Sequence, residues 1–171
     1  MPTSDLLAIL QSLRSTGFRD LSDARLSATV PVSERLINEI VATTLPTSLP
    51  VREVQVHPEA GDAFAVRLSP RSGLLPSLTV KLTIQRQPSM PDAPVLVLRL
   101  ATFGGLFGIA AAALPIAQML PPGVRLEGEY VHVDLRTIAA QQGFADVLPF
   151  VRALRVTTEP GRAILHLEAA V

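Results

Sequence analysis

Cysteine is absent from this chain of 171 residues, and lysine occurs only once, as Lys81. Without cysteine there is no disulfide framework, no thiolate nucleophile and no cysteine-based zinc site, and the absence is compatible with a reducing compartment. The 15 basic and 15 acidic side chains balance, so neither a strong field nor a lysine-rich patch favours nucleic acid. We therefore expect no nucleic-acid binding.

Catalytic and metal-binding motifs are also missing from the sequence. There is no GxSxG nucleophile elbow, and His57, His132 and His166 have no second ligand at a metal-binding spacing. Each histidine falls in an expected strand, and a position on the solvent face is the simpler interpretation. Glu127 and Glu129 form a pair of carboxylates, but such a pair alone specifies no reaction. We expect a protein that is not an enzyme and has no catalytic residues, no cofactor and no metal.

Apolar residues, in contrast, are abundant. Hydrophobic residues make up 48% of the chain and charged residues 18%, whereas about 25% charge is typical of a globular domain. The length suits a single domain over residues 1–171, with residues 1–17 as a peripheral N-terminal helix. The excess of apolar residues indicates either a large core or an apolar surface that the protein uses.

No targeting segment is evident. The first five residues, Met1 to Asp5, lack the basic region of a secretory signal, so we expect a cytoplasmic protein. The 25 residues between Arg99 and Arg125 carry no charge and are long enough to cross a bilayer. Their glycines, prolines and alanines disfavour a transmembrane helix.

Helical spacing of apolar residues predicts helices over residues 5–14, 33–45 and 104–120 and a short helix over 134–143. Ser33 is a favourable N-cap for the second of these helices, and Arg35, Asn38 and Glu39 mark its solvent side. Pro115 interrupts the third helix, and a proline inside a helix should kink or divide it.

Alternation with a period of two predicts about seven strands. One strand covers Leu26 to Val30 and ends at Pro31, four lie between Pro50 and Thr102, and one runs over residues 124–135 with a β-bulge at Gly128. A last hairpin turns at 159–162. The expected fold class is α+β, with one strongly curved antiparallel sheet wrapped around amphipathic and apolar helices.

The layout of the chain resembles small bacterial domains of the tubular lipid-binding superfamily, whose better-known members are the bactericidal/permeability-increasing proteins. The resemblance rests on the strand and helix from Leu26 to Asn38, the run Val131 to Leu135, and the closing strands that begin at Leu154. It implies a curved sheet around a long helix, with a lipid or another apolar molecule in the tunnel between them.

We therefore expect non-enzymatic binding of a lipid or other hydrophobic molecule between sheet and helices. The alternative is a protein-interaction or self-assembling scaffold module with a filled core, and homo-oligomerisation and peripheral membrane contact stay open. A helix that is apolar nearly all round, such as residues 104–120, is most simply a buried core helix. The residues expected to line a ligand site are Ile37, Ile40, Val41, Phe103, Leu106, Phe107, Ile109 and Leu114.

Overall fold

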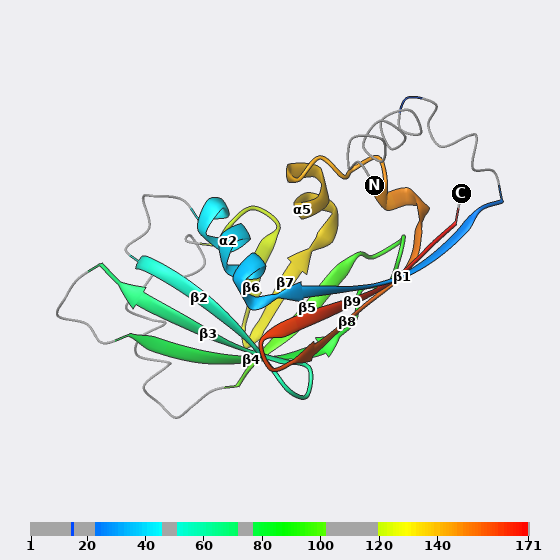
Figure 1. Cartoon of the computed structure of the whole chain (residues 1–171). Coiled ribbons are helices and arrows are strands. Elements are labelled where there is room, and N and C mark those ends of the chain that lie inside the picture. Colours follow the sequence, from blue (N-terminus) through cyan, green and yellow to red (C-terminus); the bar gives the residue numbers. More distant parts are fainter. Residues whose placement is uncertain (1–14, 16–22, 46–50, 72–76, 102–119, 171) are drawn as a thin grey trace, which may run out of the picture.

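The computed structural model describes residue 15 and residues 23–45, 51–71, 77–101 and 120–170 of the chain. These residues form an α+β structure in which antiparallel strands predominate (Figure 1). The fold class is therefore confirmed in outline. The helices expected over residues 5–14 and 104–120 lie outside the described residues, so the wrapping of a sheet around them stays a prediction.

The larger sheet has six strands in the order β2-β3-β4-β5-β7-β6 and curls into a half-barrel (Figure 1). The four strands expected between residues 50 and 102 are present as β2 to β5 and follow one another as a meander. The strands are β2 (Val51–Glu59), β3 (Ala63–Pro70), β4 (Leu78–Arg86), β5 (Val95–Ala101), β6 (Val124–Glu127) and β7 (Tyr130–Asp134).

The smaller sheet has three strands in the order β1-β9-β8. They are β1 (Arg25–Ser33), β8 (Val151–Glu159) and β9 (Arg162–Ala170). The expectation of one sheet with about seven strands is therefore wrong, because the described residues contain nine strands in two sheets. Alternation shows which residues of a strand share a face, but it does not show which strands pair.

Gly128 forms a turn, and the expected β-bulge at this position is wrong. Glu127 pairs with Tyr130 across a two-residue connection, so β6 and β7 form a hairpin. Gly128 has φ +61°, and glycine in the first central position suits the tight turns that match the twist of paired strands. The change of alternation phase at Gly128 thus marks a reversal of the chain.

The last hairpin, between β8 and β9, is confirmed. Glu159 pairs with Arg162, and Gly161 has φ +78°, as the second central position of a type II turn requires.

The pairing of β9 also determines the role of Pro31 in β1. Because hydrogen-bonding directions alternate along an antiparallel strand, the backbone groups of Val30 and Val32 point toward β9 and those of Pro31 point toward the free edge of β1. Pro31 therefore removes no bond from the ladder, and β1 continues past it to Ser33, contrary to the expected end of the strand.

Two side-chain amides close other sheet edges. Asn38 pairs with both backbone groups of Val56 in β2, at distances of 3.0 and 2.7 Å. Gln87 pairs in the same way with Val156 in β8, at 2.7 and 2.9 Å. Unpaired backbone groups at an edge would otherwise need water or another strand, so each amide occupies the place that a neighbouring strand would take.

The core joins the two sheets. Leu96 and Leu98 of β5 and Val156 of β8 are buried against one another. Around them pack half-buried side chains from both sheets, namely Phe64, Leu82, Ile84, Val131, Val133 and Leu165. The concave face of the half-barrel is therefore the apolar interior.

The described helices are short. The helix α2 (Glu34–Thr44) begins at Ser33, whose hydroxyl accepts a hydrogen bond from the backbone N–H of Leu36, which confirms the expected N-cap. The helix α5 (Leu135–Gln141) and the 3-10 turn η2 (Leu148–Phe150) follow later in the chain. None of the described helices is long and apolar enough to cross a membrane.

Asp134 caps α5, as expected, and it links stability to pH. Burial alone would raise the pKa of Asp134, but hydrogen bonds from the Thr137 hydroxyl and the backbone N–H groups of Arg136 and Thr137, with the charge of Arg136, lower it below 3.8. A carboxyl whose pKa is lowered on folding stabilises the fold above its unfolded pKa and loses this effect as pH falls.

We therefore expect Asp134→Ala to lower the free energy of unfolding by about 1 kcal/mol at pH 7. The difference from the wild type should shrink as the pH falls below about 4, the ordinary pKa of an aspartate. Urea unfolding followed by circular dichroism at pH 7 and at pH 3 measures both values. An equal difference at the two pH values would contradict the role of the carboxylate.

Candidate functional site

The concave face of the six-stranded sheet is a continuous apolar surface. Cross-strand partners share a face of a sheet, and on this face the partners from β2 to β7 are almost all aliphatic. They include Val56, Val66, Val80, Ile84, Leu98 and Val131.

The three-stranded sheet covers this surface unevenly. On β8, Val156 is 6% exposed and packs against β5. On β1, Val30 pairs with Leu165 and so faces the same interior, yet it is 46% exposed, and Leu26 on the same face of β1 is 60% exposed. The apolar interior is therefore closed along β8 and open along β1.

Among the described residues, the side chains of this interior are only partly withdrawn from water. No side chain of the described residues falls below 2% exposure. Phe64, Leu82 and Ile84 point toward the buried cluster but are only half-buried, whereas well-packed interiors withdraw such side chains from water almost completely. Within the described part of the chain, the concave face therefore keeps apolar side chains that are only half-buried.

The expected ligand residues are placed only in part. Ile37 and Val41 of α2 are half-buried, and Ile40 is 44% exposed. None of these three lines either of the grooves described below. The other five, Phe103, Leu106, Phe107, Ile109 and Leu114, lie outside the described residues.

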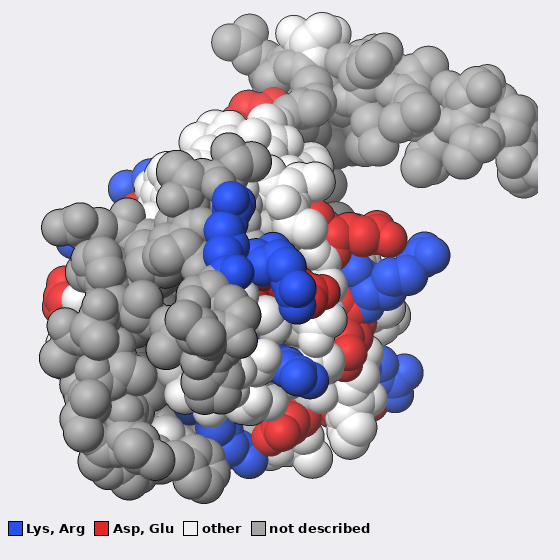
Figure 2. Space-filling model, turned by 90° about the vertical axis from the view of Figure 1, so that its left-hand side faces the viewer, with Lys and Arg blue, Asp and Glu red and all other residues white. Residues whose placement is uncertain are grey.

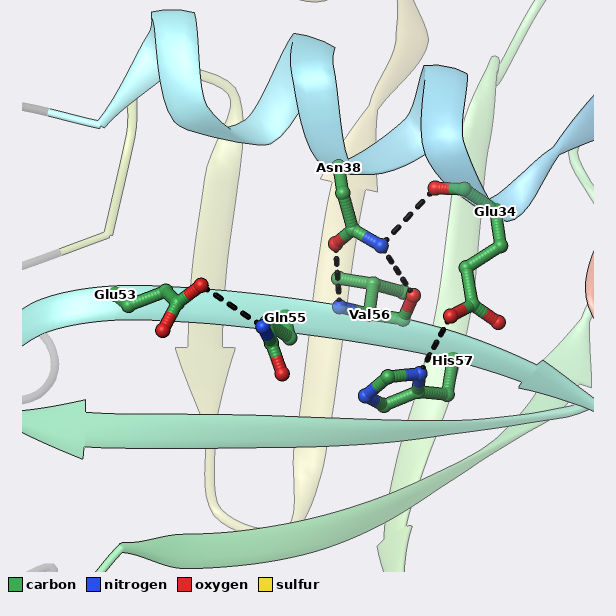
Figure 3. Close-up of polar contacts among 6 residues, drawn as sticks. All are labelled: Glu34, Asn38, Glu53, Gln55, Val56 and His57. Carbon is green, nitrogen blue, oxygen red and sulfur yellow. Dashed lines mark hydrogen bonds and ion pairs between the residues drawn. The ribbon is translucent and has the colours of Figure 1, made fainter.

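The helix α2 turns a polar face toward the sheet. Asn38 pairs with Val56, and Glu34 lies 2.7 Å from Nδ1 of His57 (Figure 3). The backbone N–H of Glu34 also donates to the carbonyl of Gly161. We call the set Glu34, Asn38, Val56 and His57 the α2 clasp.

The α2 clasp corrects two expectations. Asn38 does not lie on the solvent side of the helix, because its amide completes the hydrogen bonds of the β2 edge. His57 is half-exposed but pairs with Glu34 instead of only facing water. No sequence signal links Asn38 to Val56, since the partner is a backbone group that every residue has. Leu36, on the opposite side of α2, is 45% exposed.

A groove of about 340 Å³ runs between α2 and the edge of β2. From the helix side, the groove is lined by Glu34, Asn38, Ala42 and Leu45. These residues are four, four and three positions apart and therefore lie on one face of the helix. Near the N-terminus of α2 the groove is bounded by Glu34, Asn38 and His57 of the α2 clasp. Near the C-terminus of α2 it is bounded by aliphatic and basic side chains. The aliphatic side chains are those of Ala42, Leu45, Val51 and Val54, and the basic ones are those of Arg52 and Arg71.

A second, shallower groove of about 640 Å³ lies on the three-stranded sheet. Hydroxyl and charged side chains contribute much of its lining, including Thr29, Arg155 and Glu168. Thr157 and His166 also line it, and their side chains lie 3.1 Å apart. The arrangement offers hydrogen bonds but little enclosed apolar surface.

Two further pairs of titratable groups involve the glutamates on either side of Gly128. His132 lies 3.6 Å from Glu127, and Arg99 lies 3.3 Å from Glu129, so the two glutamates have separate partners. Within the described part of the chain, no three or more side chains of the metal-binding types come together. The described geometry thus presents an apolar interior and two grooves.

No family model matches the chain, and no curated protein or solved structure is significantly similar to it.

Proposed function

We propose that the protein binds a lipid or another hydrophobic molecule against the concave face of its half-barrel, without catalysing a reaction. The observation that carries this proposal is the uncovered apolar surface of the interior, which is open along β1 at Leu26 and Val30. Apolar surface in contact with water favours any apolar partner by roughly 25 cal/mol per Å² that becomes buried. The sequence segments that resemble tubular lipid-binding domains, from Leu26 to Asn38 and from Val131 to Leu135, point to the same class of ligand.

The open rim of the interior gives a direct test. Val30 and Thr29 are neighbours on β1, and both are exposed, but their side chains lie on opposite faces of the sheet. Val30→Asp should therefore place a charge on the ligand-binding face, whereas Thr29→Asp, the matched control, places it on the other face. Neither change removes a buried side chain.

We expect the wild type to bind oleate in a 1:1 complex, measured by native mass spectrometry and by titration calorimetry of delipidated protein. Val30→Asp should weaken binding by roughly tenfold, which corresponds to the loss of one aliphatic contact. Thr29→Asp should leave the affinity unchanged. A wild type that binds neither oleate nor oleyl alcohol nor a phospholipid would refute the function.

A protein-interaction module is the alternative, and the outward face of α2 favours it. Leu36 and Ile40 lie together on that face and are 45% and 44% exposed, as expected of a surface that another protein covers. Sedimentation over a range of concentrations distinguishes the two functions. Self-association that Leu36→Ser abolishes, with no lipid bound, would favour the module.

A further inference from the structure

The groove under α2 differs in character between its two ends. At the N-terminal end the α2 clasp fastens the helix to β2 by hydrogen bonds. At the other end, Ala42 and Leu45 face the groove, and the hydroxyls of Thr43 and Thr44 donate to the carbonyl of Ile40 within the helix. The helix is thus fixed near its start and stands over a groove near its end.

Among the described residues, the floor at this end of the groove belongs to the apolar interior. Val54 pairs with Leu68, and Val51 pairs with Pro70, so both valines lie on the face that carries Val56 and Phe64. Val51 is only 8% exposed. An aliphatic chain that enters beside Leu45 would therefore meet apolar side chains from the groove to the concave face.

The rim of the same end is basic. Arg52 and Arg71 line the groove and are exposed, and Nε of Arg71 donates to the carbonyl of Val51, at 3.3 Å. The two carboxylates of the groove have partners, because Glu34 contacts His57 and Glu53 accepts a hydrogen bond from Gln55. Figure 2, which looks onto this side of the molecule, shows basic side chains gathered near its middle.

We propose that the end of the groove beside Leu45 is the entrance to the interior. The ligand is then a single-chain amphiphile with an acidic headgroup, such as a fatty acid. Arg52 and Arg71 hold the carboxylate at the rim, and the acyl chain passes over Val51 and Val54. Guanidinium groups suit this role because they bind carboxylates through paired, charge-assisted hydrogen bonds. A groove of about 340 Å³ holds a headgroup and the first part of a chain, and the concave face takes the remainder.

The test compares oleate with oleyl alcohol, which has the same chain length and no charge. We expect the wild type to bind oleate at least tenfold more tightly at low salt, and this preference should decrease as salt screens the exposed arginines. Arg52→Gln should weaken oleate binding roughly five- to tenfold and leave oleyl alcohol binding unchanged. Arg86→Gln, the matched control, removes the same charge at the opposite end of the sheet and should have no effect.

A substitution at Glu53 should change the affinity for oleate in the opposite direction. Glu53→Gln removes a negative charge from the groove and should strengthen oleate binding about twofold, again without an effect on the alcohol. Thermal unfolding measures whether each of these variants is folded.

This inference rests on the proposed function, but the two can fail separately. If the wild type binds oleate and oleyl alcohol equally and Arg52→Gln changes neither affinity, the entrance is wrong while hydrophobic binding stands. If the wild type binds neither compound, both are wrong.

Discussion

Leu98→Ala should lower the free energy of unfolding by about 3 kcal/mol, the usual cost of removing a buried leucine side chain. Leu98 is 7% exposed and joins Leu96 and Val156 in the buried cluster between the two sheets. Its removal leaves a cavity at the place where β5 and β8 meet. Because the chain has no tryptophan and one tyrosine, urea unfolding is best followed by circular dichroism.

Ile40→Ala is the matched control for this measurement. Ile40 is 44% exposed on the outward face of α2, and alanine has the higher helix propensity, so we expect a change below about 0.5 kcal/mol. If the two substitutions cost the same, the core does not lie between β5 and β8.

Gln87→Ala should have the second largest effect, a loss of about 2 kcal/mol, because it leaves both backbone groups of Val156 without a partner. Val156 is 6% exposed, so water cannot easily replace the amide. Gln85 is an exposed residue near the end of β4, two positions before Gln87, and Gln85→Ala should cost less than about 0.5 kcal/mol.

An isosteric change isolates the hydrogen bonds of Gln87 from its packing. Gln87→Glu keeps the acceptor for the N–H of Val156 but presents a carboxylate oxygen to its carbonyl, and the two oxygens repel each other. Its cost at pH 7 should therefore equal or exceed that of Gln87→Ala. A neutral effect would show that the amide does not join the sheets.

The sequence predicts the elements that local chemistry determines. Alternation locates β2 to β5, Ser33 and Asp134 begin helices where their side chains can cap them, and the Pro160-Gly161 turn closes the last hairpin. Each of these features depends on residues that lie within a few positions of one another.

The rest depends on partners that are distant in the sequence. Nothing local indicates that β1 pairs with β9 near the other end of the chain, and the roles of Asn38 and Gln87 depend on backbone groups. Arg52 and Arg71, which line the groove, are distant from each other in the sequence and belong to no recognisable motif. The apolar pattern places Ile37, Ile40 and Val41 on α2, but it could not show that this helix presents its polar face to the sheet.

Pro31 has a consequence for how copies of this protein can meet. It faces the free edge of β1 without an N–H group, and Pro58 likewise has no N–H to offer at the edge of β2, where its carbonyl accepts a hydrogen bond from Gly161. Strand-by-strand growth of either sheet into a second molecule is therefore interrupted at both places. Assembly at these positions must use side-chain surfaces, so a fibrillar extension of the sheets is disfavoured by the covalent structure of the chain itself.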